Sequence, residues 1–228
     1  MDIYSKNEAT RVQVGESVLP LTEFATAFQT LLIMHTSNYS NVHWLGVPVW
    51  QDVLSLWTIQ ETIAEIRPRL IIETGTNRGG SALFYASLCD LMGQGGVVTI
   101  DIEKMHDLSH PRIEWLIGSS LAPEILSRVA ERVAAADGPV MVILDSDHSQ
   151  SHVAGELESY SPFVTPGSYL LVQDGIIDAL PMFADGRPGP LPALEQFLVQ
   201  HPNFEVDEAR CQRFIVTHHP RGWLRRVT

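Results

Sequence analysis

Apolar, strand-like runs alternate with helix-like runs from residue 70 onward, and this alternation constrains the fold more than any other feature of the chain. The predicted strands are Leu70–Glu73, Val97–Asp101, Ile113–Ile117, Val140–Asp145, Tyr169–Gln173 and Phe214–Thr217. The predicted helices are Gly80–Met92, Ala122–Ala136, Ser149–Tyr160 and Leu191–His201. Strands that alternate with helices form a parallel, doubly wound sheet whose ligands bind at the carboxyl ends of the strands. The sequence therefore predicts an α/β domain of this kind.

Two further helices precede the alternating region. Residues 21–35 carry Phe24, Phe28 and Leu31 at helical spacing, and "DVLSLWTIQETIAEI" is an amphipathic stretch that ends before Pro68. The segment "NVHWLGVPVW" between them is a Gly/Pro loop rich in aromatic residues. No internal repeat or linker is visible, so we expect one domain with an N-terminal helical extension.

Composition excludes several classes of partner. The 228-residue chain has a net charge of −12, which argues against a nucleic-acid-binding surface because such surfaces are basic. Its two cysteines, Cys89 and Cys211, have no metal-like spacing and favour a reducing, cytoplasmic setting. The N-terminal residues are polar, and the run "LLIM" is too short to span a bilayer. We therefore expect neither nucleic acid nor membrane as a partner.

The segment "IIETGTNRGGSALFYASL" joins the first predicted strand to a helix through a glycine-rich turn. Its spacing differs from the G-x-G-x-x-G fingerprint, and it lacks the Lys-Ser/Thr of a P-loop. Backbone N–H groups at a helix N-terminus suit an anion, which can be a carboxylate as well as a phosphate. Glu73 would repel a pyrophosphate and attract an ammonium group. A ligand with both an amine and a carboxylate, such as the methionine end of S-adenosylmethionine, satisfies both demands.

Other strand ends extend this cofactor site. Asp101 ends the second strand, where an acid can accept both hydroxyls of a ribose. The third strand is followed by "IGSS", in which Ser119 is placed to bond the adenine edge or simply to form a turn. The candidate cofactor-binding residues are Glu73, Gly75, Thr76, Gly79, Gly80, Ser81, Asp101, Ser119 and Asp145.

Oxygen ligands follow two further strands. Asp145 comes after "VMVIL", and the next strand ends in Gln173 and Asp174. Because these strand ends meet at one edge of the sheet, their oxygens suit a hard divalent ion such as Mg²⁺. The candidate metal ligands are therefore Asp145, Gln173 and Asp174.

His148 lies three residues after Asp145 and is our candidate general base, with Asp145 as the second catalytic residue. One helical turn later, His152 offers an alternative pair of transition-metal ligands with His148. A zinc protease of the H-E-x-x-H type is disfavoured, because Ser149 occupies the position of the glutamate.

The chain resembles the cephalosporin hydroxylase/rhamnosyl O-methyltransferase family of class I S-adenosylmethionine-dependent methyltransferases. The resemblance covers roughly Asn41 to the C-terminus. It rests on "HWLGVPVW", "LWTIQETIAEIRPRLIIETGTNRGGSALFYASLCDLMG", "VVTIDIE", "ILDSDHSQSHVAGELESYSPFVTPGSYLLVQDG", "GPLPALEQFL" and "GWLRRV". It implies a Rossmann-like, seven-stranded sheet, a bound S-adenosylmethionine, a Mg²⁺ site and methyl transfer to oxygen. Residues 1–66 would then form a helical cap or interface segment and residues 67–228 the methyltransferase domain.

One departure from the family concerns the metal. Members usually carry Glu-Asp where this chain has Gln173-Asp174, and a neutral amide is a weaker ligand for a hard cation. We expect weaker metal affinity or no metal use, unless Asp147 turns inward to restore the charge.

The acceptor is less constrained by the sequence. The loop Ile176–Pro192 is long and rich in Gly and Pro, which is typical of a lid. Together with Trp44, Trp50 and Trp57 it would form an aromatic pocket, although these side chains equally suit a core or a subunit interface. We expect a homo-oligomeric O-methyltransferase that acts on a sugar, a polyketide or a similar small natural product. The alternatives are a non-methylating enzyme of the same fold and an inactive cofactor-binding partner protein.

Overall fold

The computed structural model describes residues 10–228. Its helices are α1 (Leu21–Thr36), α2 (Val53–Ile66), α3 (Gly80–Met92), α4 (Pro123–Ala134), α5 (Gln150–Tyr160), α6 (Ile176–Ala179), α7 (Pro190–Gln200) and α8 (Glu208–Cys211), with 3₁₀ turns η1 (Ser161–Phe163) and η2 (Pro181–Gly186). The strands of the central sheet are β5 (Leu70–Thr74), β6 (Gly96–Asp101), β7 (Ile113–Ile117), β8 (Val140–Leu144), β9 (Tyr169–Val172), β10 (Phe204–Val206) and β11 (Trp223–Arg226). Two small hairpins, β1 (Arg11–Val14) with β2 (Ser17–Pro20) and β3 (His43–Trp44) with β4 (Val47–Pro48), precede them.

The central sheet confirms the predicted fold class. Its seven strands lie in the order β10-β11-β9-β8-β5-β6-β7, and β5 to β9 run parallel. Thr74 of β5 pairs with Ile100 on one side and Leu144 on the other. The residues that follow these positions therefore leave the sheet at the same edge, and this places the ends of β5, β6 and β8 together.

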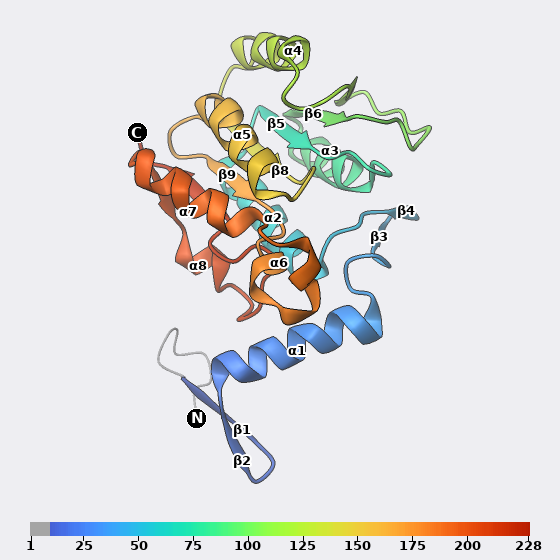
Figure 1. Cartoon of the computed structure of the whole chain (residues 1–228). Coiled ribbons are helices and arrows are strands. Elements are labelled where there is room, and N and C mark those ends of the chain that lie inside the picture. The colour runs from blue at the N-terminus through green and yellow to red at the C-terminus, as the bar shows by residue number, and fades with distance from the viewer. Residues whose placement is uncertain (1–9) are drawn as a thin grey trace.

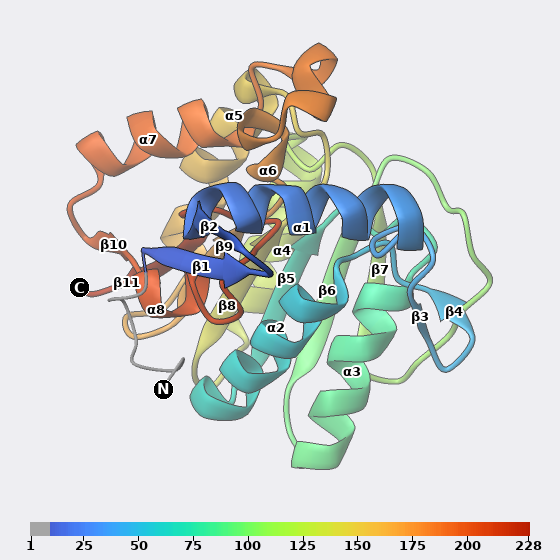
Figure 2. The same cartoon turned by 90° about the horizontal axis from the view of Figure 1, so that it is seen from below.

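Helices cover both faces of the sheet (Figures 1 and 2). One core cluster joins Leu70, Ile72 and Val142 to side chains of α4, α5 and α7. The alternate residues Ile71 and Ile143 point to the opposite face, where they meet α2 and α3. This alternation is the period of two that a strand imposes on its side chains.

Asp52 caps the N-terminus of helix α2, and its side chain accepts a hydrogen bond from the Ser55 amide. It buries Ile59 and Ile63 completely against the sheet. Full burial stabilises each of these side chains by roughly 1.5–3 kcal/mol. The division of the chain at residue 66 stays a prediction.

The predicted strand Phe214–Thr217 is wrong. These residues form turns and irregular chain, and Ile215 has a φ of +70° and is exposed. This apolar segment has no neighbouring strand with which to pair, because β10 and β11 occupy that end of the sheet and pair antiparallel with each other. Both strands mix charged with apolar residues, so the composition of neither predicts a strand of the central sheet.

The N-terminal segment contains structure beyond the predicted helix. Residues 11–20 form a hairpin, and the aromatic loop contains the short β3–β4 hairpin. Leu45 and Gly46 in its turn both have positive φ, as a two-residue hairpin turn of type I′ requires. Helix α1 lies beside α6 (Figure 1), where Ile33 packs with Ile176 and Leu180. Within the described residues, no helix has the length and apolar character needed to cross a membrane.

Candidate functional site

The turn after β5 allows two backbones to approach closely. Gly75 has a φ of +90°, and a Cβ there would lie 1.9 Å from the carbonyl oxygen of Asp145. Only glycine fits this conformation and this distance. The hydroxyl of the next residue, Thr76, lies 2.7 Å from that of Thr99 on β6. The turn is thereby fixed to both neighbouring strand ends.

The N-terminus of α3 is equally crowded. A Cβ on Gly80 would lie 2.1 Å from the carbonyl oxygen of Pro48, and a Cβ on Gly79 would lie 2.9 Å from the side chain of Leu108. The β3–β4 hairpin therefore rests directly on the glycine turn. Ser81, which follows, is buried, and its side chain favours the charged form of the Glu73 carboxylate.

Glu73 is a fully buried acid at the end of β5. Its Oε2 accepts a 2.6 Å hydrogen bond from the Thr99 hydroxyl, whereas Oε1 is buried without a partner. Burial raises the pKa of this carboxyl to about 7, although the hydrogen bonds from Ser81 and Thr99 oppose the shift. An unpartnered carboxylate oxygen beside a glycine turn fits a cationic group of a ligand, such as an ammonium.

Asp101 lies where β6 ends, next to the same turn. Its Oδ2 accepts a 2.7 Å hydrogen bond from the Asn77 amide, and the side chain is partly exposed. Ile102 follows it, and Ile117 ends the neighbouring strand β7; both are exposed, the first to 75% and the second to 52%. An acid flanked by two exposed apolar side chains suits a ligand in which a hydroxylated ring is attached to a flat, apolar ring.

The loop after β7 places two serines differently. Ser119 is exposed, and its Oγ accepts a 3.4 Å hydrogen bond from the Leu121 amide. Ser120 is buried, with its Oγ 3.2 Å from Nε2 of His152. The sequence reasoning named Ser119 only, because nothing local distinguishes the inward serine from the outward one.

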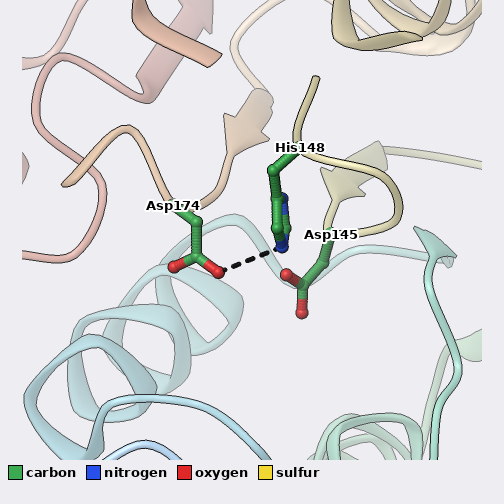
Figure 3. A group of neighbouring side chains, drawn as sticks. All are labelled: Asp145, His148 and Asp174. Carbon is green, nitrogen blue, oxygen red and sulfur yellow. Dashed lines mark ion pairs between the residues drawn. The ribbon is translucent and has the colours of Figure 1, made fainter. Parts of the chain in front are cut away.

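Asp145, His148 and Asp174 come together at the edge of the sheet (Figure 3). Ligand atoms of the three side chains all lie within 4.8 Å of one another. Asp145 follows β8 and Asp174 comes two residues after the end of β9, and these strands are parallel neighbours. Nε2 of His148 lies 3.3 Å from Oδ2 of Asp174.

The two carboxylates of this cluster, Asp145 and Asp174, repel each other. Burial, Asp174 and Glu73 raise the pKa of the Asp145 carboxyl well above its usual range. Nε2 of Gln51 donates a 3.1 Å hydrogen bond to Oδ2 of Asp145. Two carboxylates and one imidazole form a donor set that fits a divalent cation, with oxygen for a hard ion and nitrogen for a transition ion.

His219, which the sequence reasoning missed, fixes the backbone of Asp174. The Asp174 amide donates a 3.1 Å hydrogen bond to Nδ1 of this histidine. Burial lowers the pKa of His219 to about 4, so the ring is neutral and Nδ1 is free to accept. Asp174 itself has a φ of +56°, an uncommon conformation for a residue other than glycine. The histidine therefore helps to hold a strained strand end in place.

The surroundings of three other residues named from the sequence are as follows. Gln173 is buried, its side chain lies close to the Tyr85 hydroxyl, and its Nε2 has no hydrogen-bond partner. Asp147 is exposed and accepts a hydrogen bond from the Ser149 amide, so it does not turn inward to restore a charge. His152 does not pair with His148, because its Nε2 contacts Ser120, Ser146 and Glu156.

A cavity of about 140 Å³ lies beside Asp174. Its walls include Tyr39, Trp50, Gln51, Phe183 and His218. Of the three tryptophans in the predicted aromatic pocket, Trp50 alone lines this cavity. The Trp44 indole donates to the Ser87 hydroxyl and packs edge-on against Phe84, whereas Trp57 is exposed on α2 and donates to Glu61.

The loop predicted as a lid forms α6 and η2 and supplies Ile176, Ile177 and Phe183 to the cavity. Asp178 accepts hydrogen bonds from the amides of Gly189 and Leu191. These bonds tie the two ends of the loop together.

Comparison with known proteins identifies the family. The family described as rhamnosyl O-methyltransferase/CmcI matches residues 36–227. The rhamnosyl O-methyltransferase of Mycobacterium tuberculosis strain H37Rv is 32% identical over 202 residues, which are 83% of this chain and 82% of that protein. The rhamnosyl O-methyltransferase of Mycobacterium leprae is 33% identical over 192 residues, with 82% and 83% of the two chains covered.

Among solved structures, CmcI-D160 with Mg and SAM aligns with a TM-score of 0.66 at 20% identity, over 84% of this chain and 78% of that one. This likeness agrees with the seven-stranded α/β fold. The family model matches residues 36–227, and this range includes the glycine turn with its buried acid and the carboxylates at the strand ends. The chain belongs to the rhamnosyl O-methyltransferase/CmcI family of class I S-adenosylmethionine-dependent methyltransferases.

Proposed function

We propose that this chain, an S-adenosylmethionine-dependent O-methyltransferase, methylates a hydroxyl group of a sugar or of a similar small natural product. The observation that carries the proposal is the cavity that borders Asp174, the carboxylate paired with His148. Two relatives that are about one third identical over most of this chain bear the name rhamnosyl O-methyltransferase, which supports a sugar hydroxyl as the acceptor.

The cofactor would bind along the edge formed by β5, β6 and β7. The unpartnered Oε1 of Glu73 would accept a hydrogen bond from the amino group of the methionine moiety. The free acceptor capacity of Asp101 would serve the ribose hydroxyls. Ile102 and Ile117 would cover the adenine with apolar surface, with Ser119 at its edge.

Asp145 and Asp174 would hold Mg²⁺, with water as the remaining ligands. A bound cation would lower the pKa of an acceptor hydroxyl and help to orient it. Gln173 is the third candidate ligand, and its neutral amide near Tyr85 would contribute little charge. We therefore propose a metal site that is weaker than one with three carboxylates.

His148 would act as the general base. Its ring is partly exposed, and Nε2 lies at the carboxylate that borders the cavity. The acceptor hydroxyl would give its proton to Nε2 while its oxygen forms a bond to the methyl carbon. The carbon–sulfur bond of the sulfonium breaks in the same step and leaves S-adenosylhomocysteine. The protein's main contribution would be alignment of the two reactants.

The alternative is a binding module without activity. Gln173 is the observation that favours it, because a charge is missing at a position where the family usually has one. The open cavity beside Asp174 argues against it, since a module that binds only the cofactor has no need for a second cavity at the strand-end carboxylates.

We also propose that the chain forms a homo-oligomer through α1. This helix buries Gln29 and Ile33 toward the body, yet Phe28, Leu31 and Met34 on other sides are exposed. Exposed apolar side chains beside the buried side of the helix offer a second partner surface.

The test is direct. Purified protein is first titrated with S-adenosylhomocysteine by calorimetry and then incubated with methyl-labelled S-adenosylmethionine and methyl α-L-rhamnopyranoside. We expect cofactor binding and a mass increase of one methyl group on the sugar. Cofactor binding without transfer to any hydroxylated acceptor of a broad panel would support the inactive module instead.

A further inference from the structure

The cavity beside Asp174 has the size and the wall chemistry of a site for one ring. Its volume is about 140 Å³. An apolar cavity of about 150 Å³ holds one benzene molecule. The cavity therefore has room for a single six-membered ring, and larger parts of an acceptor would extend out through its open side.

The walls divide into apolar and polar parts. Tyr39 and Trp50 meet edge to face with ring centroids 6.3 Å apart, and Phe183 lies on the side supplied by η2. Gln51, Asp174 and His218 supply the polar groups. Flat apolar walls with a few polar groups suit a ring that is apolar on its faces and hydroxylated around its rim, as a pyranose is.

His218 is the polar group that the reaction does not yet explain. The residue is 6% exposed, and its Nε2 is buried without a hydrogen-bond partner. Its Nδ1 lies 3.9 Å from Oδ1 of Asp174. The ring centroids of Tyr39 and His218 are 6.4 Å apart. A buried ring nitrogen without a partner is costly, and a ligand hydroxyl in the cavity would remove that cost.

We propose that the cavity binds one pyranose ring of the acceptor and that His218 selects rings with two neighbouring hydroxyl groups. The inference rests on the proposed O-methyl transfer. One hydroxyl lies at Asp174 and His148 and is methylated, while the adjacent one bonds Nε2 of His218. Because Nδ1 of the His218 ring lies 3.9 Å from Oδ1 of Asp174, we expect the two side chains to bond oxygens on adjacent ring carbons.

The experiment measures binding of methyl α-L-rhamnopyranoside, and of its 2-, 3- and 4-deoxy analogues, to the full chain saturated with S-adenosylhomocysteine. Ligand-observed NMR titrations give the affinities of the wild type, His218→Ala, His218→Gln and Trp50→Ala. Trp57→Ala is the matched control, since that tryptophan is exposed outside the cavity. Affinity for S-adenosylhomocysteine reports on folding and tests the cofactor site separately.

We expect His218→Ala to weaken binding of the parent glycoside about three- to tenfold, as the loss of one hydrogen bond does. Glutamine should restore part of it, because its amide can reach the same position. One deoxy analogue should bind the wild type as weakly as the parent glycoside binds His218→Ala. The affinity of that analogue should not fall further in His218→Ala, since both changes remove the same bond. Trp50→Ala should weaken every analogue, whereas Trp57→Ala should change none.

Three results would overturn the inference. Equal wild-type affinity for all three deoxy analogues would remove the selection for a second hydroxyl, and this measurement stands even if His218→Ala fails to fold. If the loss caused by His218→Ala adds to the loss caused by each of the three deoxy changes, the histidine contacts something other than these hydroxyl groups. Failure of every pyranoside to bind a protein that binds S-adenosylhomocysteine would reject the pyranose, while leaving the methyltransferase itself in place.

Discussion

Glu73→Gln should make the cofactor-free protein more stable above neutral pH. The folded-state pKa of this buried carboxyl is about 7 against an ordinary value of 4.5. The folded chain therefore holds the proton more tightly than the unfolded chain. The contribution of Glu73 to stability is constant below about pH 4.5, falls between pH 4.5 and 7, and reaches a lower plateau above.

The size of the effect follows from the same shift. A difference of about 2.5 pH units corresponds to roughly 3 kcal/mol at 1.36 kcal/mol per unit. Because Gln resembles the protonated acid in shape, the variant and the wild type should have similar stability near pH 4. At pH 8 the variant should be more stable by up to roughly 3 kcal/mol, which is about 6–12 °C in Tm for a chain of this size.

The assay is thermal unfolding followed by circular dichroism between pH 4 and 8, without cofactor. Asp101→Asn is the control, because it removes the same charge from a partly exposed position at the next strand end. Calorimetry should also show that Glu73→Gln binds S-adenosylmethionine more weakly, since the charged partner of the ammonium is gone. Stability curves of variant and wild type that run parallel across the whole pH range would refute the reasoning.

The other predictions concern the remaining site residues. Asp101→Ala should weaken S-adenosylmethionine about tenfold or more, since a lost bond to a buried polar group costs roughly 1–3 kcal/mol; unchanged affinity in calorimetry would remove this acid from the ribose site. His148→Ala should lower turnover by roughly 10²–10⁴ with near-normal cofactor affinity, and near-normal turnover at saturating substrate would assign the base elsewhere. Activity should require high Mg²⁺ and fall with a chelator. Gln173→Glu should tighten Mg²⁺ binding and Asp174→Ala abolish it, whereas full activity in excess chelator with no metal by elemental analysis would rule the site out.

The arrangement of the proposed cofactor half of the site is predictable from the sequence because its signals are local. An acid before a glycine turn and another acid at the next strand end follow from strand alternation alone. Gly75 and Gly80 are required by contacts with Asp145 and Pro48, yet their spacing already marked the turn. The same logic brought Asp145 and Asp174 together, because parallel neighbours end at one edge.

The acceptor half was only partly predictable, because its walls come from distant parts of the chain. Gln51 reaches Asp145 across a sequence separation of 94 residues. His218 and His219 follow Phe214–Thr217, for which the sequence predicts a strand, so their position beside Asp174 has no local signal. A pair of histidines before a proline is compatible with many irregular structures, and only packing places one at the cavity and the other on a backbone amide.

The contact between Gly80 and Pro48 has a consequence for the binding of the acceptor. Gly80 begins α3 at the cofactor turn, and the hairpin that presses on it continues directly into Trp50 and Gln51 in the acceptor cavity. Any shift of the turn on ligand binding would therefore reach two walls of the cavity through this hairpin. We expect occupancy of the turn by S-adenosylhomocysteine to change the affinity of the protein for an acceptor in the cavity, which binding titrations with and without S-adenosylhomocysteine would measure.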